Sequence, residues 1–382
     1  MPRAIYADFN GTTPPGSGAK AWMSKALETW GNPSSVHALG QQARGLLDEA
    51  RASVAKACGR KPSEVVFTSG GSEANTMALW GSAMGKKDYR ILTSTVEHSS
   101  VRDTCTMLAR LGAKVEYVKI KASGELDWDD FVAKLDRFNP NLISLMTANN
   151  ETGVLFPVPE IVREARARKI LVHTDAVQAL GKLSATYWEG ADLISLSAHK
   201  IRGPKGVGAL LLRDGLQLES THFGGGQETK RRGGTENLMG ICGFAGACSE
   251  LSQDPHDDAS SSLATLRNRF EAEIKEFLTG TTIVGETARR LSNTSNIRFR
   301  GISSEVLLSA LDLDGLYISA GSACSSGSLK PSPVLLAMGF SENEARECVR
   351  FSWGVITTES EILEAAKLVA SHVTRIRERK GR

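Results

Sequence analysis

Short apolar runs alternate with amphipathic stretches through the first two-thirds of the chain. The apolar runs have the length of strands and lie at 65–69, 90–96, 114–120, 141–148, 170–176, 192–198 and 207–213. Between most of them, segments such as VRDTCTMLARLG and PEIVREARARK repeat their apolar residues at helical spacing. This alternation is typical of βαβ units, so we predict an α/β fold with a mainly parallel seven-stranded sheet covered by helices.

The regular alternation stops at a polar stretch, SQDPHDDASSS, at 252–262. We interpret this stretch as a linker or as the start of a long helix. The residues that follow have the mixed pattern of a smaller α+β domain. We therefore predict a large domain over 12–255 and a small domain formed by 1–11 and 256–382.

The overall charge favours small-molecule chemistry. Basic residues number 46 and acidic residues 43, so the balance points to neither nucleic acid nor an anionic membrane as a partner. The first residues, MPRAIYADFN, lack the basic start and apolar region of a signal peptide, and no stretch reaches the apolar length that spans a bilayer. We therefore expect a cytoplasmic protein.

The six cysteines form neither a CxxC pair nor a close cluster with histidines, so we expect reduced thiols and no metal site. Five of them fall in segments with the pattern of a helix or a helix end, where a cysteine packs as a small apolar residue: Cys58, Cys105, Cys242, Cys248 and Cys348. The sixth, Cys324, lies in SAGSACSSGSLKPSP. Because Gly, Ser, Ala and Pro bury little apolar surface, this composition predicts a loop with an exposed thiol.

Three motifs that follow predicted strands carry candidate chemistry. TSGGSEANT at 68–76 runs from a strand through two glycines into a helix, a turn that can present backbone N–H groups to a phosphate. HTDAVQ at 173–178 places Asp175 at the end of a strand, and SLSAHKIRGPKG at 195–206 does the same for Ser197, His199 and Lys200. Each motif alone has an ordinary explanation as a tight turn, a helix N-cap or a surface loop.

The combination of these motifs matches the needs of one cofactor, pyridoxal 5′-phosphate (PLP). PLP requires a lysine for its Schiff base, an acid beside its pyridine nitrogen, donors around its phosphate and a flat face over its ring. The chain offers all of these at the carboxyl ends of predicted strands: Lys200, Asp175, the turn at 70–72 with Ser197 and His199, and His98. The sequence therefore predicts a PLP enzyme.

Further motifs extend this pattern along the whole chain: YADFNGTTP, GNPSSVHALG, VEHSSV, NNETG, GGGQE followed by RGGTEN, SAGSACSSG and VRFSWG. In order and approximate spacing they resemble the NifS/IscS-like cysteine desulfurases of the class V aminotransferase superfamily. The resemblance implies a fold-type I PLP-dependent transferase. Its large domain would bind the cofactor, and its smaller α+β domain would carry the loop with the catalytic cysteine.

The resemblance also implies a role for each residue that matches a family motif. Lys200 would form the Schiff base, Asp175 would pair with the pyridine nitrogen, and Gln178 would donate to the ring hydroxyl. His98 would stack on the ring and act in catalysis. The remaining cofactor-binding positions are Gly71, Ser72, Asn150, Ser197, His199 and Thr235. The family match of Thr235 is to a phosphate contact made by the other subunit, which implies a homodimer.

Three more positions match residues that handle the substrate. Asn150 and Arg350 would orient L-cysteine, the arginine through a fork onto the α-carboxylate. Cys324 would accept the sulfur as a persulfide while L-alanine is released. A sulfur-acceptor protein, either an iron–sulfur scaffold or another sulfurtransferase, would then receive the sulfur.

Two alternatives remain open at this point. A selenocysteine lyase, or a PLP lyase for another amino acid, uses the same cofactor residues. A non-catalytic scaffold could keep the fold, although the intact set of cofactor and substrate positions argues against it. The chain also departs from the family pattern at Phe9, Gly11 and Ser72, and Thr229 stands before a basic cluster at 230–232 where the family often has arginine.

Overall fold

A computed structural model describes residues 4–251, 258–320 and 330–380 of the chain. Its largest element is a seven-stranded sheet with the order β2-β8-β7-β6-β5-β3-β4. The strand β8 runs antiparallel to both of its neighbours, and the other pairs are parallel. The strands are β2 (Val65–Thr68), β3 (Arg90–Ser94), β4 (Lys114–Val118), β5 (Leu142–Ser144), β6 (Leu171–Asp175), β7 (Leu193–Ser197) and β8 (Gly208–Leu212). All seven predicted strands are confirmed, each within the predicted range.

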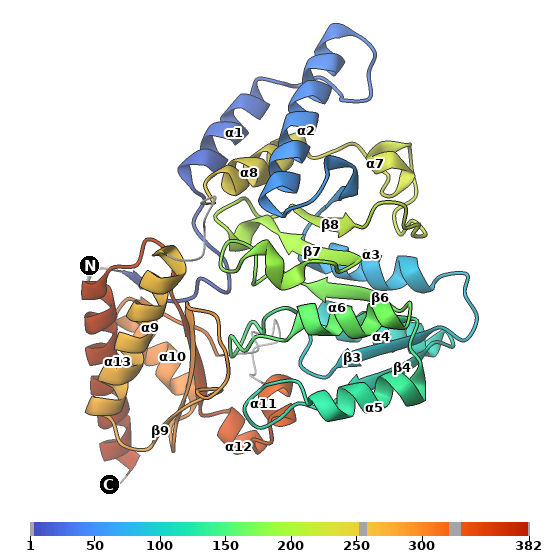
Figure 1. Cartoon of the computed structure of the whole chain (residues 1–382). Helices are drawn as coiled ribbons and strands as arrows, with labels where there is room; N and C mark the ends of the chain where they lie inside the picture. The colour runs from blue at the N-terminus through green and yellow to red at the C-terminus, as the bar shows by residue number, and fades with distance from the viewer. Residues whose placement is uncertain (1–3, 252–257, 321–329, 381–382) are drawn as a thin grey trace.

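Helices cover both faces of this sheet (Figure 1). Successive strand residues point to opposite faces, so Val65 and Phe67 lie in one core while Val66 lies in another. The helices α3 (Gly71–Ala83) and α4 (Ser99–Arg110) pack in the second core. The first core receives α1 (Ser17–Leu27), α2 (Ala38–Ala57), α5 (Trp128–Phe138), α6 (Val158–Ala167) and α8 (Leu238–Ser249), and the short α7 (Gln227–Lys230) precedes α8.

A separate core joins the N-terminal residues to the C-terminal third of the chain. The strand β1 (Ile5–Tyr6) pairs with β11 (Leu316–Tyr317), and a second sheet has the order β12-β10-β9. Aromatic rings of Phe270, Phe351 and Trp353 pack together at the centre of this core. Its elements are α9 (Asp258–Phe277), β9 (Thr281–Ile283), β10 (Thr294–Phe299), α10 (Ser304–Leu313), β12 (Cys348–Ser352) and α13 (Glu359–Lys380). The short helices α11 (Pro333–Ala337) and α12 (Glu342–Ala345) pack instead against the first core of the large sheet. The domain boundaries proposed above stay a prediction.

The cysteines show one error in the sequence interpretation. Cys58 caps the end of α2, while Cys105 lies in α4 and Cys242 and Cys248 lie in α8, as predicted. Cys348, however, begins the strand β12, because the helical pattern of ENEAREC ends at Ala345 and the apolar run CVRFS then pairs with β10. All five thiols are buried. Cys324 lies outside the described residues.

The described part of the chain contains no helix that is both long and apolar enough to cross a membrane. In the same residues, no group of three or more His, Cys, Asp or Glu side chains is arranged to hold a metal ion.

Candidate active site

A cavity of about 840 Å³ opens at the carboxyl ends of the large sheet's strands. Its walls come from both regions of the molecule, since residues of the N-terminal segment and of β12 face the strand ends. Ten of the predicted site residues line it: Gly71, Ser72, His98, Asn150, Asp175, Gln178, Ser197, His199, Lys200 and Arg350. The structure thus brings these positions together, as the motifs led us to expect. Thr235 is exposed and does not line the cavity, and Cys324 lies outside the described residues.

Strand ends explain why these side chains meet. Asp175 is the last residue of β6, and Lys200 follows β7 in a short 3-10 turn, Ala198–Lys200. Because β6 and β7 are parallel neighbours, with Asp175 opposite Ser195, both residues emerge at the same edge of the sheet. The turns after β2 and β3 bring in Gly71 and His98 at the same edge.

The amine of Lys200 has a pKa well below that of an ordinary lysine. Its Nζ donates to the carbonyl oxygens of Asn10 and Gly11, each at 2.6 Å. Burial and the nearby Arg350 lower the pKa of this lysine to about 8, although Asp8 and Asp175 act in the opposite direction. An amine with such a pKa can act as a nucleophile or as a base near physiological pH.

The carboxylate of Asp175 is held by hydrogen bonds on both oxygens. Asn75 donates from Nδ2 to its Oδ2 at 2.7 Å, and the backbone N–H of Val177 donates to its Oδ1 at 2.9 Å. The residue is 8% exposed. A buried carboxylate in one fixed orientation can face a protonated ring nitrogen, as the cofactor requires.

Gln178 belongs to a hydrogen-bonded chain that includes an unexpected lysine. Its Nε2 donates to the carbonyl of Asn10 at 3.0 Å, while its Oε1 accepts from Nζ of Lys182 at 2.8 Å. Burial and the positive charges of Lys200 and Arg350 lower the pKa of Lys182 to about 7. Because its oxygen is already engaged, the amide of Gln178 keeps its N–H donors toward the Asn10 side.

The start of α3 supplies the candidate phosphate site. The first N–H groups of a helix have no partner within the helix, and Gly71 and Ser72 stand at that position. A Cβ on Gly71 would lie 2.7 Å from Cγ2 of Val177, so the close approach of this turn to the HTDAVQ segment requires glycine. His199 accepts or donates a hydrogen bond with Oγ1 of Thr12 at 3.1 Å, and burial lowers its pKa to about 4.

The side chain of His98 caps the N-terminus of α4. Its Nδ1 accepts from the backbone N–H of Ser100 at 3.2 Å, so the neutral ring carries its proton on Nε2. The preceding Glu97 is buried and has its Oε1 held by Ser94 and by the backbone N–H of Met146. Burial raises the pKa of Glu97 to about 8, which makes it mainly a neutral acid at pH 7.

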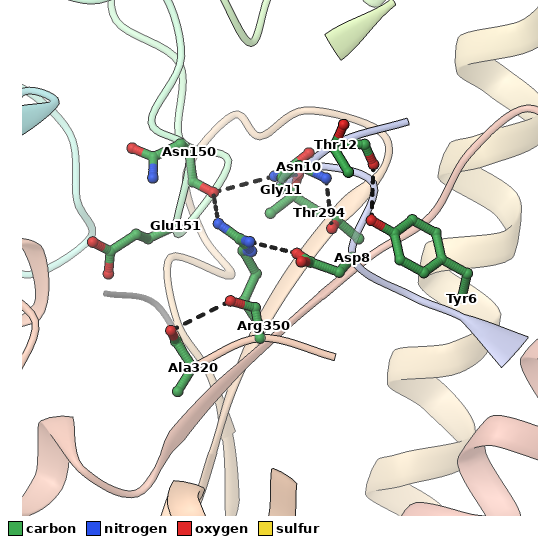
Figure 2. Close-up of polar contacts among 12 residues, drawn as sticks. Tyr6, Asp8, Asn10, Gly11, Thr12, Asn150, Glu151, Thr294, Ala320 and Arg350 are labelled. Carbon is green, nitrogen blue, oxygen red and sulfur yellow. Dashed lines mark hydrogen bonds and ion pairs between the residues drawn. The ribbon is translucent and has the colours of Figure 1, made fainter. Parts of the chain in front are cut away.

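Arg350 contacts Asn150 through the asparagine's backbone carbonyl and not through its side chain. Nη1 of Arg350 donates to the carbonyl oxygen of Asn150 at 2.9 Å, and Nη2 donates to Oδ1 of Asp8 at 2.6 Å (Figure 2). The arginine is 5% exposed. Its guanidinium is thus a buried cation at the wall of the cavity, on the side supplied by β12 and the N-terminal segment.

The segment with Thr229 and the basic cluster at 230–232, which departs from the family pattern, contacts the start of α3. Glu228, Thr229 and Lys230 have positive φ angles of 46°, 58° and 64°, a left-handed run without glycine. Arg232 donates from Nε to Oε1 of Glu73 at 3.0 Å, and Glu73 lies in the first turn of α3. This cluster therefore reaches the helix that starts at the candidate phosphate site.

The donors and acceptors present fit PLP. An amine, a fixed carboxylate and an exposed helix start are the groups that its aldehyde, its ring nitrogen and its phosphate need. Four residues of the cavity wall also carry buried polar atoms that have no hydrogen-bond partner among the described residues: Asn75 Oδ1, Glu97 Oε2, Arg102 Nε and Arg350 Nε. A bound cofactor and substrate would offer polar groups next to these walls.

Comparison with known proteins agrees with this geometry. The sequence profile of the family described as Aminotransferase class-V matches residues 5–364. This chain belongs to that family. Among its relatives, the cysteine desulfurase IscS of Dictyoglomus turgidum is 41% identical over 366 residues, which cover 95% of this chain and 92% of the relative. Cysteine desulfurase 2 of Trichormus variabilis is 39% identical, with coverage of 98% and 94%.

Solved structures show the same likeness. A "NIFS-LIKE PROTEIN" superimposes with a TM-score of 0.88 at 32% identity and covers 97% of this chain and 100% of that one. The structure "SspA in complex with cysteine" reaches a TM-score of 0.80 at 33% identity, with coverage of 93% and 100%. These matches confirm the NifS/IscS-like resemblance, the fold-type I α/β class and an enzyme with cysteine desulfurase function. Enzymes of this family generally depend on PLP.

The residues at the site that were not singled out from the sequence include Asp8, Asn10, Asn75, Glu97 and Lys182. Lys182 follows Gln178 by four residues, a spacing that could have drawn attention to it. Asp8 and Asn10 lie in the quoted motif YADFNGTTP, but nothing local to that motif reveals a partner near residue 350.

Proposed function

We propose that this chain converts L-cysteine to L-alanine with PLP held on Lys200, and passes the sulfur through Cys324 to an acceptor protein. The observation that carries the proposal is the meeting of Lys200, Asp175 and Arg350 at one cavity. These residues supply an amine, a fixed acid and a carboxylate receptor, which together suit an α-amino acid substrate bound beside PLP.

The residues that would hold the cofactor are those of the sheet edge. Nζ of Lys200 would bind it covalently, Asp175 would face its ring nitrogen and Gln178 its ring hydroxyl. Its phosphate would lie at the start of α3 with Ser197 and His199, and the His98 imidazole would lie on the ring. Bound there, PLP supplies an electron sink that weakens the bonds at the α-carbon of an amino acid. Nζ of Lys200, when free, can take and return the α-proton because its pKa lies near 8.

Arg350 and Asn150 would bind the substrate. A guanidinium offers paired N–H donors that match the two oxygens of an α-carboxylate. The hydrogen bond from Arg350 to the backbone of Asn150 fixes the distance between the two residues. The substrate would therefore enter with its carboxylate toward β12 and its amino group toward Lys200.

Cys324 would take the sulfur. Its thiolate would attack the sulfur of the substrate, so that a sulfur–sulfur bond forms while the bond between that sulfur and the β-carbon breaks. The residues on either side of its segment support this role, because Ser319 and Lys330 line the same cavity. Ser319 exchanges two backbone hydrogen bonds with Arg350, and Ser332 donates from Oγ to Glu151 at 2.5 Å.

The proposal extends to a cytoplasmic homodimer. Thr235 is exposed in this chain, which leaves it available to a second copy. A contact from Thr235 to the partner's phosphate site would make the dimer necessary for full cofactor binding. Light scattering with activity measured on the same fractions tests this part, and a fully active monomer would contradict it.

The experiment that tests the proposed function is product analysis. Purified enzyme loaded with PLP is given L-cysteine and a thiol reductant, and alanine and sulfide are measured together. We expect equal amounts of both. Absence of alanine would contradict the proposal, and release of alanine from selenocysteine alone would show a selenocysteine lyase instead.

A further inference from the structure

Asp8 accepts a hydrogen bond from Arg350, the arginine that we propose binds the substrate's α-carboxylate. Its Oδ1 accepts from Nη2 of Arg350 at 2.6 Å, and the opposite nitrogen is held by the carbonyl of Asn150 (Figure 2). The side chain of Asp8 is 27% exposed, whereas that of Arg350 is 6% exposed. The guanidinium is therefore fixed from two sides by groups of this chain before any substrate arrives.

Gly11 makes room for the carboxylate of Asp8. A Cβ added to Gly11 would lie 2.3 Å from Oδ2 of Asp8, 2.8 Å from its Cγ and 3.0 Å from its Oδ1. The three nearest heavy atoms thus all belong to the side chain of Asp8. Gly11 does not have a positive φ, so alanine would fit its backbone.

Hydrogen bonds hold the backbone of Asp8 in place, so we expect its side chain to move when a Cβ is added at position 11. The N–H groups of Gly11 and Thr12 donate to the carbonyl of Asp8 at 2.9 and 3.3 Å. Asp8 also forms a β-bridge with Ser352, the last residue of β12, which is the strand that carries Arg350. Adding a methyl group at position 11 would therefore push the carboxylate away from its present place.

We propose that Asp8 is a positioning residue for substrate binding, and that Gly11 is the residue that lets it act. The carboxylate holds the guanidinium of Arg350 in one orientation, so that binding of the substrate's α-carboxylate costs less conformational freedom. This inference rests on the proposed function, because it takes Arg350 as the carboxylate receptor. The side chain of Asp8 does not touch the reacting atoms in this scheme. Gly11 contacts Nζ of Lys200 only through its backbone carbonyl, which an alanine would keep. Changes at both positions should therefore act on binding more than on turnover.

The test is a mutant cycle in the PLP-loaded enzyme, with KM and kcat for L-cysteine taken from alanine release. We expect Asp8→Ala to raise KM about tenfold, the size of one charge-assisted hydrogen bond, with a smaller change in kcat because the charge of Asp8 also acts on the pKa of Lys200. Asp8→Asn should raise it less, because an amide oxygen still accepts from Nη2. Gly11→Ala should raise KM in the same direction as Asp8→Ala.

The double variant separates positioning from general damage. In the Asp8→Ala background the clash is gone, so Gly11→Ala should add no further change in KM. Gly45→Ala serves as the matched control, since a Cβ there meets nothing within 4 Å in an exposed part of α2. The absorbance of the lysine-bound cofactor reports that each variant is folded and loaded. If Asp8→Ala loses this absorbance, Asp8→Asn and Gly11→Ala carry the test.

Arg350→Lys distinguishes the two ways in which the idea can fail. If this variant raises KM while the Asp8 variants leave it unchanged or lower it, the positioning role is overturned and the proposed function stands. An additive effect of Gly11→Ala on Asp8→Ala has the same meaning. If Arg350→Lys leaves KM unchanged, the substrate role of Arg350 is wrong and the positioning role falls with it.

Discussion

The two sides of the cavity are built in different ways. On the cofactor side, Asp175, Gln178 and Lys200 lie at or just after the ends of two neighbouring parallel strands. Gly71, Ser72 and His98 follow two further strands of the same sheet. On the substrate side, Asp8 and Arg350 form an ion pair across 342 positions of sequence, and Asn150 reaches the same arginine across 200. The cofactor side thus follows from local sequence and the rules of parallel sheets. The substrate side depends on the packing of the chain's first residues against β12.

The electrostatics of the two sides differ as well. Around the cofactor side, burial keeps Glu97 mainly protonated and lowers the pKa of Lys200 and Lys182. On the substrate side, the buried charge of Arg350 keeps a direct acidic partner in Asp8. Groups with shifted pKa values therefore lie on the proposed cofactor side, and under the proposed function the fixed ion pair marks where the substrate carboxylate would bind. The predictions below test this division.

The largest effect is expected from Lys200→Ala. Under the proposed function, loss of this amine would remove both the covalent anchor and the proton-transferring base, so alanine release should fall by about ten-thousandfold or more. The absorbance of the lysine-bound cofactor should vanish while circular dichroism stays that of the wild type. A variant that still held the cofactor in a borohydride-reducible bond would show that another lysine is the anchor.

A smaller but still large effect is expected from Asp175→Ala. Without its charge the pyridine nitrogen loses the partner that keeps it protonated, so removal of the α-proton should slow by about a hundredfold or more. Substrate binding should change little, because Arg350 lies on the other side of the cavity. Solvent-deuterium exchange at the α-carbon measures this step directly. Exchange at the wild-type rate would contradict the assignment.

The smallest of these effects concerns stability and comes from Glu97. Burial raises the pKa of Glu97 in the folded state to about 8, above the ordinary glutamate pKa of 4.5, so the folded state binds the proton more tightly than the unfolded state. This contribution to stability is fully present below about pH 4.5 and is lost as the pH rises through about 8. In the Glu97→Gln variant the side chain is neutral at every pH. Its free energy of unfolding should therefore fall less than that of the wild type between about pH 4.5 and 8, and the two proteins should differ in this fall by up to a few kcal/mol. Urea unfolding of both proteins at several pH values measures the difference, and parallel curves would contradict the buried neutral acid.

The sequence predicted the fold better than it predicted the substrate side of the site. Apolar runs bounded by turns are strong local signals, and all seven strands of the large sheet were found from them. Cys348 was assigned wrongly because the helical ENEA segment ends only three residues before it. Asp8 and Glu97 were missed for a different reason: burial and distant partners decide their roles, and neither can be read from neighbouring residues.

The most direct test of the central claim is sulfur transfer by Cys324→Ser. Lys200, Asp175 and His98 remain in this variant, so it should keep the cofactor's absorbance and still exchange the α-proton of L-cysteine with solvent. It should release almost no alanine, and mass spectrometry should find no added sulfur on the protein, while the wild type carries it on Cys324. Full alanine release by Cys324→Ser, or added sulfur on one of the five other cysteines of the wild type, would contradict the claim.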